Sequence, residues 1–199
     1  DEAKVILVFH VVGTVMELYK TANGSWTYPE DNMLRIAGVP LFSGFMYASV
    51  GSYFARVWRL FDFRFTGYPP FWATVVLSAV IYVNFFSHEF FFDLRYLLFL
   101  AVILLFGRTW VYFTVPTGHR RRLPLMFALV CIATVIWGAE NFSTLGRIWI
   151  YPHQTDGWDF VPASKLGSWF LLMIISGVLV SLVQRPKAEV RLEVRERDA

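Results

Sequence analysis

The chain has 199 residues, of which 56% are hydrophobic and only 17% are charged, so it is more apolar than an ordinary soluble domain of this length. An aromatic share of 19% suits a protein whose solvent is partly lipid, because indole and phenol rings settle at the level of the headgroups. The formal net charge of +3 is sorted between loops rather than gathered in one patch, so we expect a lipid bilayer and no nucleic acid as partner.

Six apolar stretches predict transmembrane helices. In chain order they are Val5–Tyr19, Val39–Ala55, Phe71–Phe86, Leu97–Val115, Leu123–Gly138 and Ser168–Val183. Several are shorter than the roughly 20 residues that span a bilayer, but flanking Trp, Tyr, Gly and Pro residues can extend them. The predicted fold class is therefore all-α, a transmembrane bundle of about six helices formed by residues 1–187. A rival interpretation, six short core helices of a soluble protein, fits the composition poorly.

The basic residues predict how the bundle is oriented. Arginine, lysine and histidine gather in the segments after the second, fourth and sixth stretches, whereas acidic residues dilute the basic ones in the other loops. The positive-inside rule then places both observed termini in the cytoplasm, in what we expect to be a bacterial inner membrane. The first residues carry neither an initiator Met nor a signal-peptide pattern, so we expect the chain to be processed or partial.

The charged tail, residues 188–199, alternates apolar and charged residues with a period of two, which is typical of a strand. Such a strand can add to the sheet edge of a partner subunit. Its charge density equally favours a disordered cytoplasmic tail.

A repeated spacing predicts an internally duplicated helical hairpin. The first copy reads Glu17, Trp26, Tyr28 and Pro29, and the second reads Glu140, Trp149, Tyr151 and Pro152. Each copy continues to a Val-Pro pair, Val39-Pro40 or Val161-Pro162, at the start of the next predicted helix. Both copies have the same predicted membrane orientation, as duplicated membrane hairpins can.

The two repeated carboxylates, Glu17 and Glu140, are candidate catalytic residues. Carboxylates near the end of an apolar helix tend to face the protein interior or a wet cavity. If the two meet, repulsion in a low dielectric favours keeping one protonated, as a general acid beside a base. In the other interpretation each Glu braces its own loop, for example by accepting a hydrogen bond from the neighbouring Trp N–H.

Other polar residues can reach the same region. His10 lies two helical turns before Glu17 and is a candidate for a proton path, although a histidine on an apolar helix is often a packing residue. Asn84 can line a cavity or join two helices. Arg108 can bind a substrate anion or extend to the inner headgroups. The repeated rings, Trp26, Tyr28, Trp149 and Tyr151, are candidate binding residues.

Metal and cofactor chemistry has little support. His88, Glu89, Asp93 and His153 are the group that most resembles metal ligands, but their spacing matches no established zinc pattern, so we predict no metal site. No phosphate loop, nucleophile elbow, CxxC pair or haem motif is present, and the sequence identifies no cofactor. The single Cys131 lies in an apolar run, where we expect packing.

Four runs of the sequence resemble an uncharacterised bacterial integral-membrane family, domain of unknown function 817. They are residues 4–10 (KVILVFH), 24–30 (GSWTYPE), 38–49 (GVPLFSGFMYAS) and 106–113 (FGRTWVYF), and the likeness covers nearly the whole chain. The resemblance implies that the chain shares the fold of this family and is preceded by further hydrophobic sequence. It implies no activity, because the family has none assigned.

A fainter similarity links the paired Glu residues and aromatic-Pro turns to membrane enzymes that act on carotenoid ends. It implies protonation of a polyene by carboxylates, but residues 41–43 (LFS) stand where the small-subunit lycopene cyclases among these enzymes carry an acidic pair.

Three classes of function remain open. The first expectation is an accessory or structural subunit of a larger membrane complex, in contact with other subunits, lipids or pigments. The alternative is a cofactor-free membrane enzyme that acts on an isoprenoid or lipid through the paired carboxylates, with Trp and Tyr rings stabilising positive charge. A small transporter is the third, although the predicted helices lack the breaks and central charges of transport sites.

Overall fold

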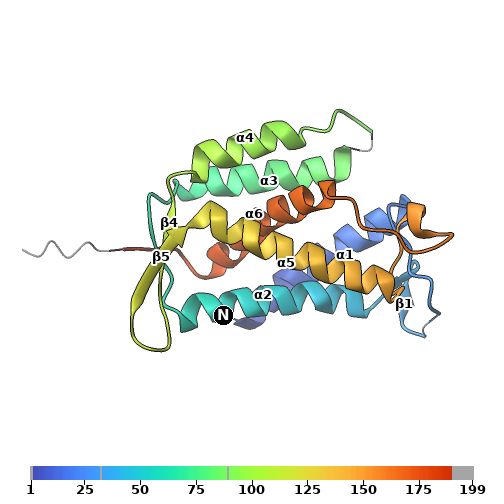
Figure 1. Cartoon of the computed structure of the whole chain (residues 1–199), viewed down its shortest axis with the longest axis horizontal. Coiled ribbons are helices and arrows are strands. Elements are labelled where there is room, and N and C mark those ends of the chain that lie inside the picture. The colour runs from blue at the N-terminus through green and yellow to red at the C-terminus, as the bar shows by residue number, and fades with distance from the viewer. Residues whose placement is uncertain (1, 32, 89, 190–199) are drawn as a thin grey trace, which may run out of the picture.

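The computed structural model describes residues 2–31, 33–88 and 90–189, and it is mostly helical (Figure 1). Its six helices within these residues are α1 (Glu2–Ala22), α2 (Phe42–Leu60), α3 (Phe71–Ser87), α4 (Arg95–Phe106), α5 (Leu125–Leu145) and α6 (Ser164–Val183). A 3-10 turn, η1, covers Pro152–Gln154. The number of helices agrees with the expectation of about six, but of the described helices only α1, α5 and α6 are long and apolar enough to cross a membrane.

A small sheet caps one end of the bundle, which the predicted all-α class did not include. Its strands are β3 (Arg64–Thr66), β4 (Trp110–Thr114), β5 (Arg120–Pro124) and β6 (Lys187–Ala188), in the order β5-β4-β3-β6. Strand β6 runs parallel to β3, and the other pairs are antiparallel. A second, two-stranded sheet, β1 (Arg35–Ile36) with β2 (Val39–Pro40), lies in the loop between α1 and α2.

The hairpin of β4 and β5 corrects the fourth and fifth predicted helices. Helix α4 ends at Phe106 rather than Val115, and α5 begins at Leu125 and continues past Gly138 to Leu145. Aromatic and β-branched residues from Trp110 to Thr114 favour a strand, and Gly118 turns the chain with a φ of 81°. The apolar run is continuous in sequence, but only its first part is helical.

The tail begins as a strand of this chain's own sheet. Strand β6 pairs with β3, and the N–H of Glu189 donates to the carbonyl of Phe65 at 2.9 Å. The Glu189 carboxylate accepts from Arg120 at 2.6 Å. Residues 190–199, the rest of the predicted tail, lie outside the described residues.

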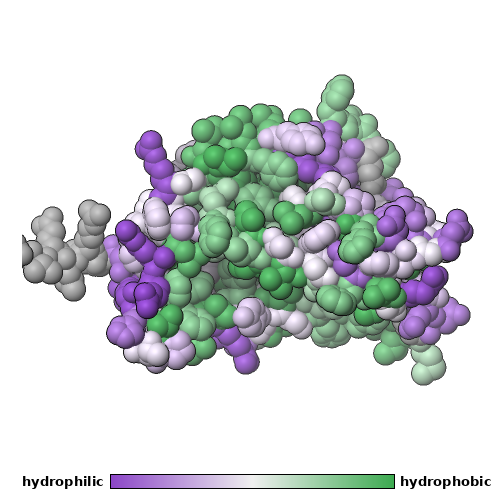
Figure 2. All heavy atoms as spheres, viewed as in Figure 1, coloured by the Kyte–Doolittle hydropathy of each residue, from purple (hydrophilic) through white to green (hydrophobic). Residues whose placement is uncertain are grey.

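The surface is apolar between two polar ends. Figure 2 shows hydrophobic residues along the middle of the molecule and hydrophilic ones gathered at both ends of the long axis. Within the described residues, α1, α5 and α6 are long and apolar enough to cross a membrane, and α3 and α4 are shorter apolar helices. This pattern is typical of a membrane protein whose long axis follows the bilayer normal.

The sheet gathers the basic segments that follow α2, α4 and α6. Strand β3 brings Arg64, β5 brings Arg120 and β6 brings Lys187 to the same end of the bundle. The turns after α1 and α5 lie at the opposite end (Figure 1).

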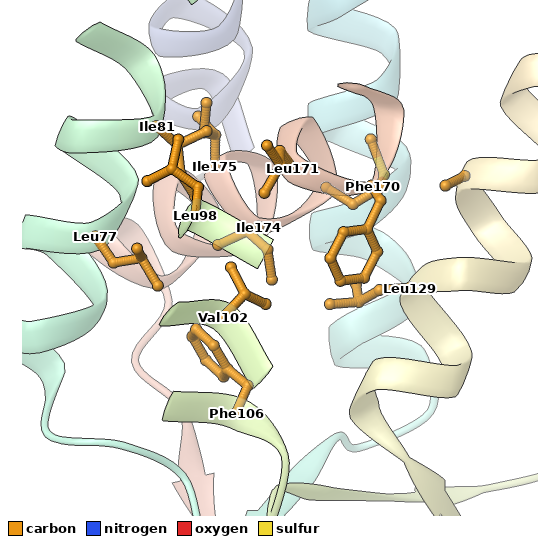
Figure 3. Packing of buried hydrophobic residues seen from close by; sticks show 12 residues of the cluster. Leu77, Ile81, Leu98, Val102, Phe106, Leu129, Phe170, Leu171, Ile174 and Ile175 are labelled. Atoms are coloured by element: carbon orange, nitrogen blue, oxygen red, sulfur yellow. The ribbon is translucent and has the colours of Figure 1, made fainter. Parts of the chain in front are cut away.

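Helix α6 forms the centre of the apolar core. Figure 3 shows Phe170, Leu171, Ile174 and Ile175 of α6 packed among side chains of α3, α4 and α5. A second cluster joins α1 and α2 to the sheet and meets α6 at Val180. The core is thus divided between the hairpin of α1 and α2 and the helices on the other side of α6.

Glycines let α1 and α2 approach closely, as small residues do in membrane helices. A Cβ at Gly13 would overlap the ring of Tyr47, and one at Gly51 would overlap the ring of Phe9. A Cβ at Gly44 would overlap His10 and Thr14. The close approach matters for the site, because Tyr47 reaches across it.

Candidate functional site

The same helix end occurs in both copies of the repeat. After α1 the N–H of Ser25 donates to the carbonyl of Lys20 at 2.9 Å, and after α5 the N–H of Ile148 donates to Ser143 at 3.0 Å. This bond is the signature of a Schellman cap, which needs a left-handed residue just before it. Gly24 supplies it in the first copy, with a φ of 70°, and Arg147 in the second, with a φ of 55°. Each cap turns the chain so that the following aromatic residues run back toward the helix.

The first carboxylate, Glu17, is 4% exposed and accepts three side-chain hydrogen bonds. Its Oε2 accepts from Trp26 Nε1 at 2.9 Å and from the Tyr28 hydroxyl at 2.7 Å. Its Oε1 accepts from the Tyr47 hydroxyl at 2.9 Å. The bracing contact that the sequence suggested between Glu17 and its neighbouring Trp is therefore present.

The second carboxylate, Glu140, is also 4% exposed and has a matching arrangement. Its Oε1 accepts from the Tyr151 hydroxyl at 2.5 Å, and its Oε2 accepts from Trp169 Nε1 at 2.7 Å. Trp169 of α6 supplies the indole donor here, whereas the repeated tryptophan of this copy, Trp149, lines a cavity between the two hairpins.

Tyr47 and Trp169 are absent from the sequence-based candidates, yet they extend the repeat by one helix. Each repeated Tyr lies 11 residues after its Glu. The further donor lies 30 residues after Glu17 in the first copy and 29 residues after Glu140 in the second. Continuing the comparison of the two copies past the Val-Pro pairs would have found them.

The two aromatic turns contact each other directly. Thr27 and Ile150 form an antiparallel bridge, with N–H to carbonyl distances of 3.0 and 2.9 Å. Beside it the rings of Trp26 and Tyr151 meet edge to face, with centroids 6.2 Å apart. The Nζ of Lys165 lies 4.3 Å from the Tyr151 ring centroid and 5.7 Å from that of Trp26. Lys165, expected only as a loop charge, thus lies where the two copies meet.

Both carboxylates border one cavity of about 370 Å³ between the two hairpins. Helices α1, α2, α5 and α6 supply most of its walls, and the two aromatic turns close one end. Its lining is mainly apolar and includes Phe9, Met46, Ile136, Leu172 and Met173. The volume lies within the ~300–1,000 Å³ of typical ligand sites.

The phenols of the turns are held as hydrogen-bond donors. Burial, and then the neighbouring Glu17 carboxylate, raise the pKa of the Tyr28 phenol above its usual value. Burial and the Glu140 carboxylate likewise raise the pKa of Tyr151. Both therefore keep their protons at neutral pH and donate to the carboxylates.

The remaining sequence-based candidates lie elsewhere. His10 packs against Phe45 with ring centroids 4.7 Å apart, toward α2, and its Nδ1 has no hydrogen-bond partner among the described residues. Asn84 joins α3 to the start of α4, accepting from the N–H of Leu94 at 3.0 Å. Arg108 is predicted inside the fourth helix, but that helix ends at Phe106, and Arg108 is exposed in the turn before β4. It lies at the sheet end, far along the bundle from the aromatic turns.

Within the described residues, no group of three or more His, Cys, Asp or Glu side chains is arranged to hold a metal ion. Asp93, from the group considered in the sequence, instead pairs with Arg95 at 3.3 Å.

Solved structures with the same fold come from a mycobacterial protein. A crystal structure of MvINS, described as an Insig homolog from Mycobacterium vanbaalenii, has a TM-score of 0.59 and 14% identity, covering 92% of this chain and 96% of that one. A crystal structure of a cross-linked trimer of an MvINS variant has a TM-score of 0.60 and 15% identity, with the same coverage. At this identity the likeness concerns the fold alone.

Sequence comparisons identify the family. An uncharacterized protein of Bacillus subtilis, YoaT, is 45% identical over 189 residues, which are 95% of this chain and 71% of the relative. The family model described as protein of unknown function (DUF817) matches residues 1–177. The resemblance inferred from the four sequence runs is thus confirmed, and the chain belongs to the DUF817 family.

Proposed function

We propose that this protein binds a lipid or isoprenoid molecule in the cavity between its two helical hairpins. The observation that carries the proposal is the cavity itself, which is apolar along its walls and has two buried carboxylates at one end. An apolar site with a few fixed polar groups is the common form of a small-molecule site. A ligand that fits it has an apolar chain and a polar end.

A second apolar cavity gives the chain of such a ligand room to continue. It has a volume of about 300 Å³ and lies between α2, α5, α6 and the sheet. Met173 lines both cavities, and aromatic side chains such as Trp58, Phe63 and Phe65 surround the second one. The shared Met173 places the two cavities side by side, which supports a ligand whose apolar chain extends from the aromatic turns toward the sheet.

The proposal includes duplication of the hairpin, because equivalent positions in the two copies perform equivalent tasks. The caps at Gly24 and Arg147, the Tyr donors 11 residues after each Glu, and the bridge between Thr27 and Ile150 all support it. Gathering of the basic segments at the sheet end supports a cytoplasmic location for that end, in a bacterial inner membrane.

Ala139 offers a way to test the cavity. It lies on α5 at the cavity wall, and Ala139→Trp would fill part of the space. We expect lipids extracted from the purified protein and identified by mass spectrometry to include one stoichiometric species that the variant loses. The matched control is Ala79→Trp, at an exposed position of α3. Equal lipid content in the wild type and both variants would contradict the proposal.

Acid–base chemistry on the bound molecule is a second candidate, favoured by the presence of both Glu17 and Glu140 on one cavity. In that case the variant Glu17→Gln, Glu140→Gln should retain its lipid and its fold while the cellular lipid or pigment profile changes. An unchanged profile with the protein assembled would rule out the enzyme and leave a binding protein.

Assembly into a larger complex, the first expectation from the sequence, is a further proposal, and the MvINS variant that shares this fold is described as a cross-linked trimer. We expect the purified protein in mild detergent to have the mass of an oligomer or of a complex with other subunits. A single-protomer mass under those conditions would contradict assembly, whatever the cavity binds.

A further inference from the structure

The two carboxylates of the cavity can accept more hydrogen bonds than the protein supplies. A carboxylate has about four acceptor sites and no donor, whereas an indole N–H or a phenol O–H donates a single hydrogen bond. In the part of the chain that the structure describes, Glu17 accepts three side-chain bonds, which leaves about one site open. Glu140 accepts two, which leaves about two sites open. Acceptor capacity therefore remains on both carboxylates, and more of it on Glu140.

The aromatic donors next to the carboxylates have no such reserve. Five phenol and indole groups of the lining each direct their only polar hydrogen to a carboxylate; they are Trp26, Tyr28, Tyr47, Tyr151 and Trp169. Trp149 and Lys165 are further donors of the lining, and the hydroxyls of Ser168 and Ser176 accept as well as donate. The groups fixed around the carboxylates thus offer acceptors rather than donors to a bound molecule.

An open acceptor site on a buried carboxylate favours a donor beside it. Glu17 and Glu140 are both 4% exposed, and both line a cavity whose walls are mainly apolar. A charged acceptor with too few donors in such surroundings costs free energy, and a donor supplied by a ligand recovers it as a charge-assisted hydrogen bond. An ether, ester or carboxylate end would instead place its oxygen lone pairs against the carboxylate oxygens. The cavity therefore selects a ligand whose polar end donates.

The two carboxylate clusters belong to the same end of the cavity. Trp26, a donor to Glu17, and Tyr151, the phenol donor to Glu140, meet edge to face with ring centroids 6.2 Å apart. The rest of the lining is mainly apolar and includes Met173, which also borders the second cavity. The donor is therefore expected at one end of the ligand rather than along its chain.

From these open acceptor sites we propose that the cavity binds an amphiphile whose polar end is a hydrogen-bond donor, a hydroxyl or an amine. Glu140 is the principal partner of that group, and Glu17 is the second. The inference deepens the function proposed above and rests on it, because the cavity must hold the ligand for the carboxylates to select its end. Hydroxyl and amine share the donor chemistry, and the experiment separates them.

Three probes with the same chain test the polar end: farnesol and farnesylamine, which can donate, and farnesyl methyl ether, which only accepts. Each is added to the full chain in detergent, and binding is followed by the fluorescence of the tryptophans in the cavity wall, Trp26, Trp149 and Trp169. We expect both donors to bind at least about tenfold more tightly than the ether, since one charge-assisted hydrogen bond contributes that much. The tighter of the two identifies the end group that the site prefers.

Glu140→Gln tests the principal partner. Glutamine keeps one acceptor oxygen but loses the charge, so the affinity for farnesol and farnesylamine should fall roughly fivefold, while the affinity for the ether changes little. Glu2→Gln is the matched control, because Glu2 is also a carboxylate on a helix that accepts three side-chain bonds. It lies at the other end of α1 from Glu17, so its substitution should change none of the three affinities.

The outcomes separate this inference from the proposed function. Equal affinities for the two donors and the ether would overturn the donor preference while leaving binding in the cavity intact. A folded Glu140→Gln variant that binds farnesol and farnesylamine as the wild type does would overturn it as well. If none of the three probes binds, the proposed function fails and this inference fails with it. Should Glu140→Gln not fold, the comparison of the three probes on the wild type still decides.

Discussion

Gly13 is the position on α1 that lets the ring of Tyr47 pass between the helices to Glu17. A Cβ built there would overlap Cβ, Cγ and Cδ2 of Tyr47, so Gly13→Ala must displace the tyrosine. Displacement breaks the 2.9 Å hydrogen bond to Glu17. Overpacking costs about 1–3 kcal/mol and loss of a bond to a charged group about 1.5–3 kcal/mol, which together predict a loss of roughly 3–5 kcal/mol in the free energy of unfolding.

The same substitution elsewhere supplies the control. Gly138 lies in α5, and a Cβ at this glycine would meet nothing within 4 Å. Gly138→Ala should therefore stabilise the helix by about 0.5–1 kcal/mol. Both variants can be compared by denaturant-induced unfolding of the detergent-solubilised protein, followed by tryptophan fluorescence.

A double-mutant cycle tests the mechanism as well as the magnitude. Tyr47→Phe in the wild type removes one donor to Glu17 and should cost about 1.5–3 kcal/mol. In the Gly13→Ala background that bond is already lost, so the same change should cost less than about 0.5 kcal/mol. Additive effects, or a Gly13→Ala variant as stable as Gly138→Ala, would refute the reasoning.

Three further predictions concern the helix caps and the second copy. Arg147→Gly should raise the free energy of unfolding by about 0.5–1 kcal/mol, because Arg147 has a left-handed φ of 55°, and Gly24→Ala should lower it by about 1 kcal/mol. A thermal melt in which Arg147→Gly is destabilising or Gly24→Ala is stabilising would contradict the shared cap. Trp169→Phe should cost about 2–3 kcal/mol by leaving one oxygen of the buried Glu140 without its indole donor, and an unchanged unfolding midpoint would show that the bond is unimportant. The raised pKa of Tyr151 means that the folded state favours the protonated phenol, so the contribution of Tyr151 to stability is complete below the unfolded pKa of about 10 and is lost at higher pH. When the free energy of unfolding is measured against pH, Tyr151→Phe should show a shallower alkaline decline than the wild type. Identical slopes would contradict this assignment.

The sequence predicted that the chain is mostly helical and where most of the apolar helices lie, because apolar runs are local patterns. Long apolar runs require helices in a membrane, and the Glu, Trp and Tyr spacing fixed which residues follow each cap. The contacts of Glu17 with Trp26 and Tyr28 lie within one turn region, so a bracing role could be inferred before the structure was known.

Other parts depended on packing between distant segments. Tyr47 and Trp169 act across a helix–helix contact, and no single window of sequence contains both a donor and its acceptor, so only a longer comparison of the two copies could have singled them out. The strand from Trp110 was hidden because it continues the apolar run of α4 without a polar break. Arg108 was therefore placed inside a helix that ends before it.

The paired bridge between Thr27 and Ile150 has a consequence for the order of assembly. Each hairpin joins two helices that are consecutive in the chain, so the two can form early and independently, whereas the bridge joins residues far apart in the chain and requires the hairpins to dock. The cavity exists only after that docking. A molecule that fills it therefore binds the docked state alone and stabilises it in proportion to the logarithm of its concentration. If the proposed lipid fills the cavity, the abundance of the assembled protein in cells should follow the supply of that lipid.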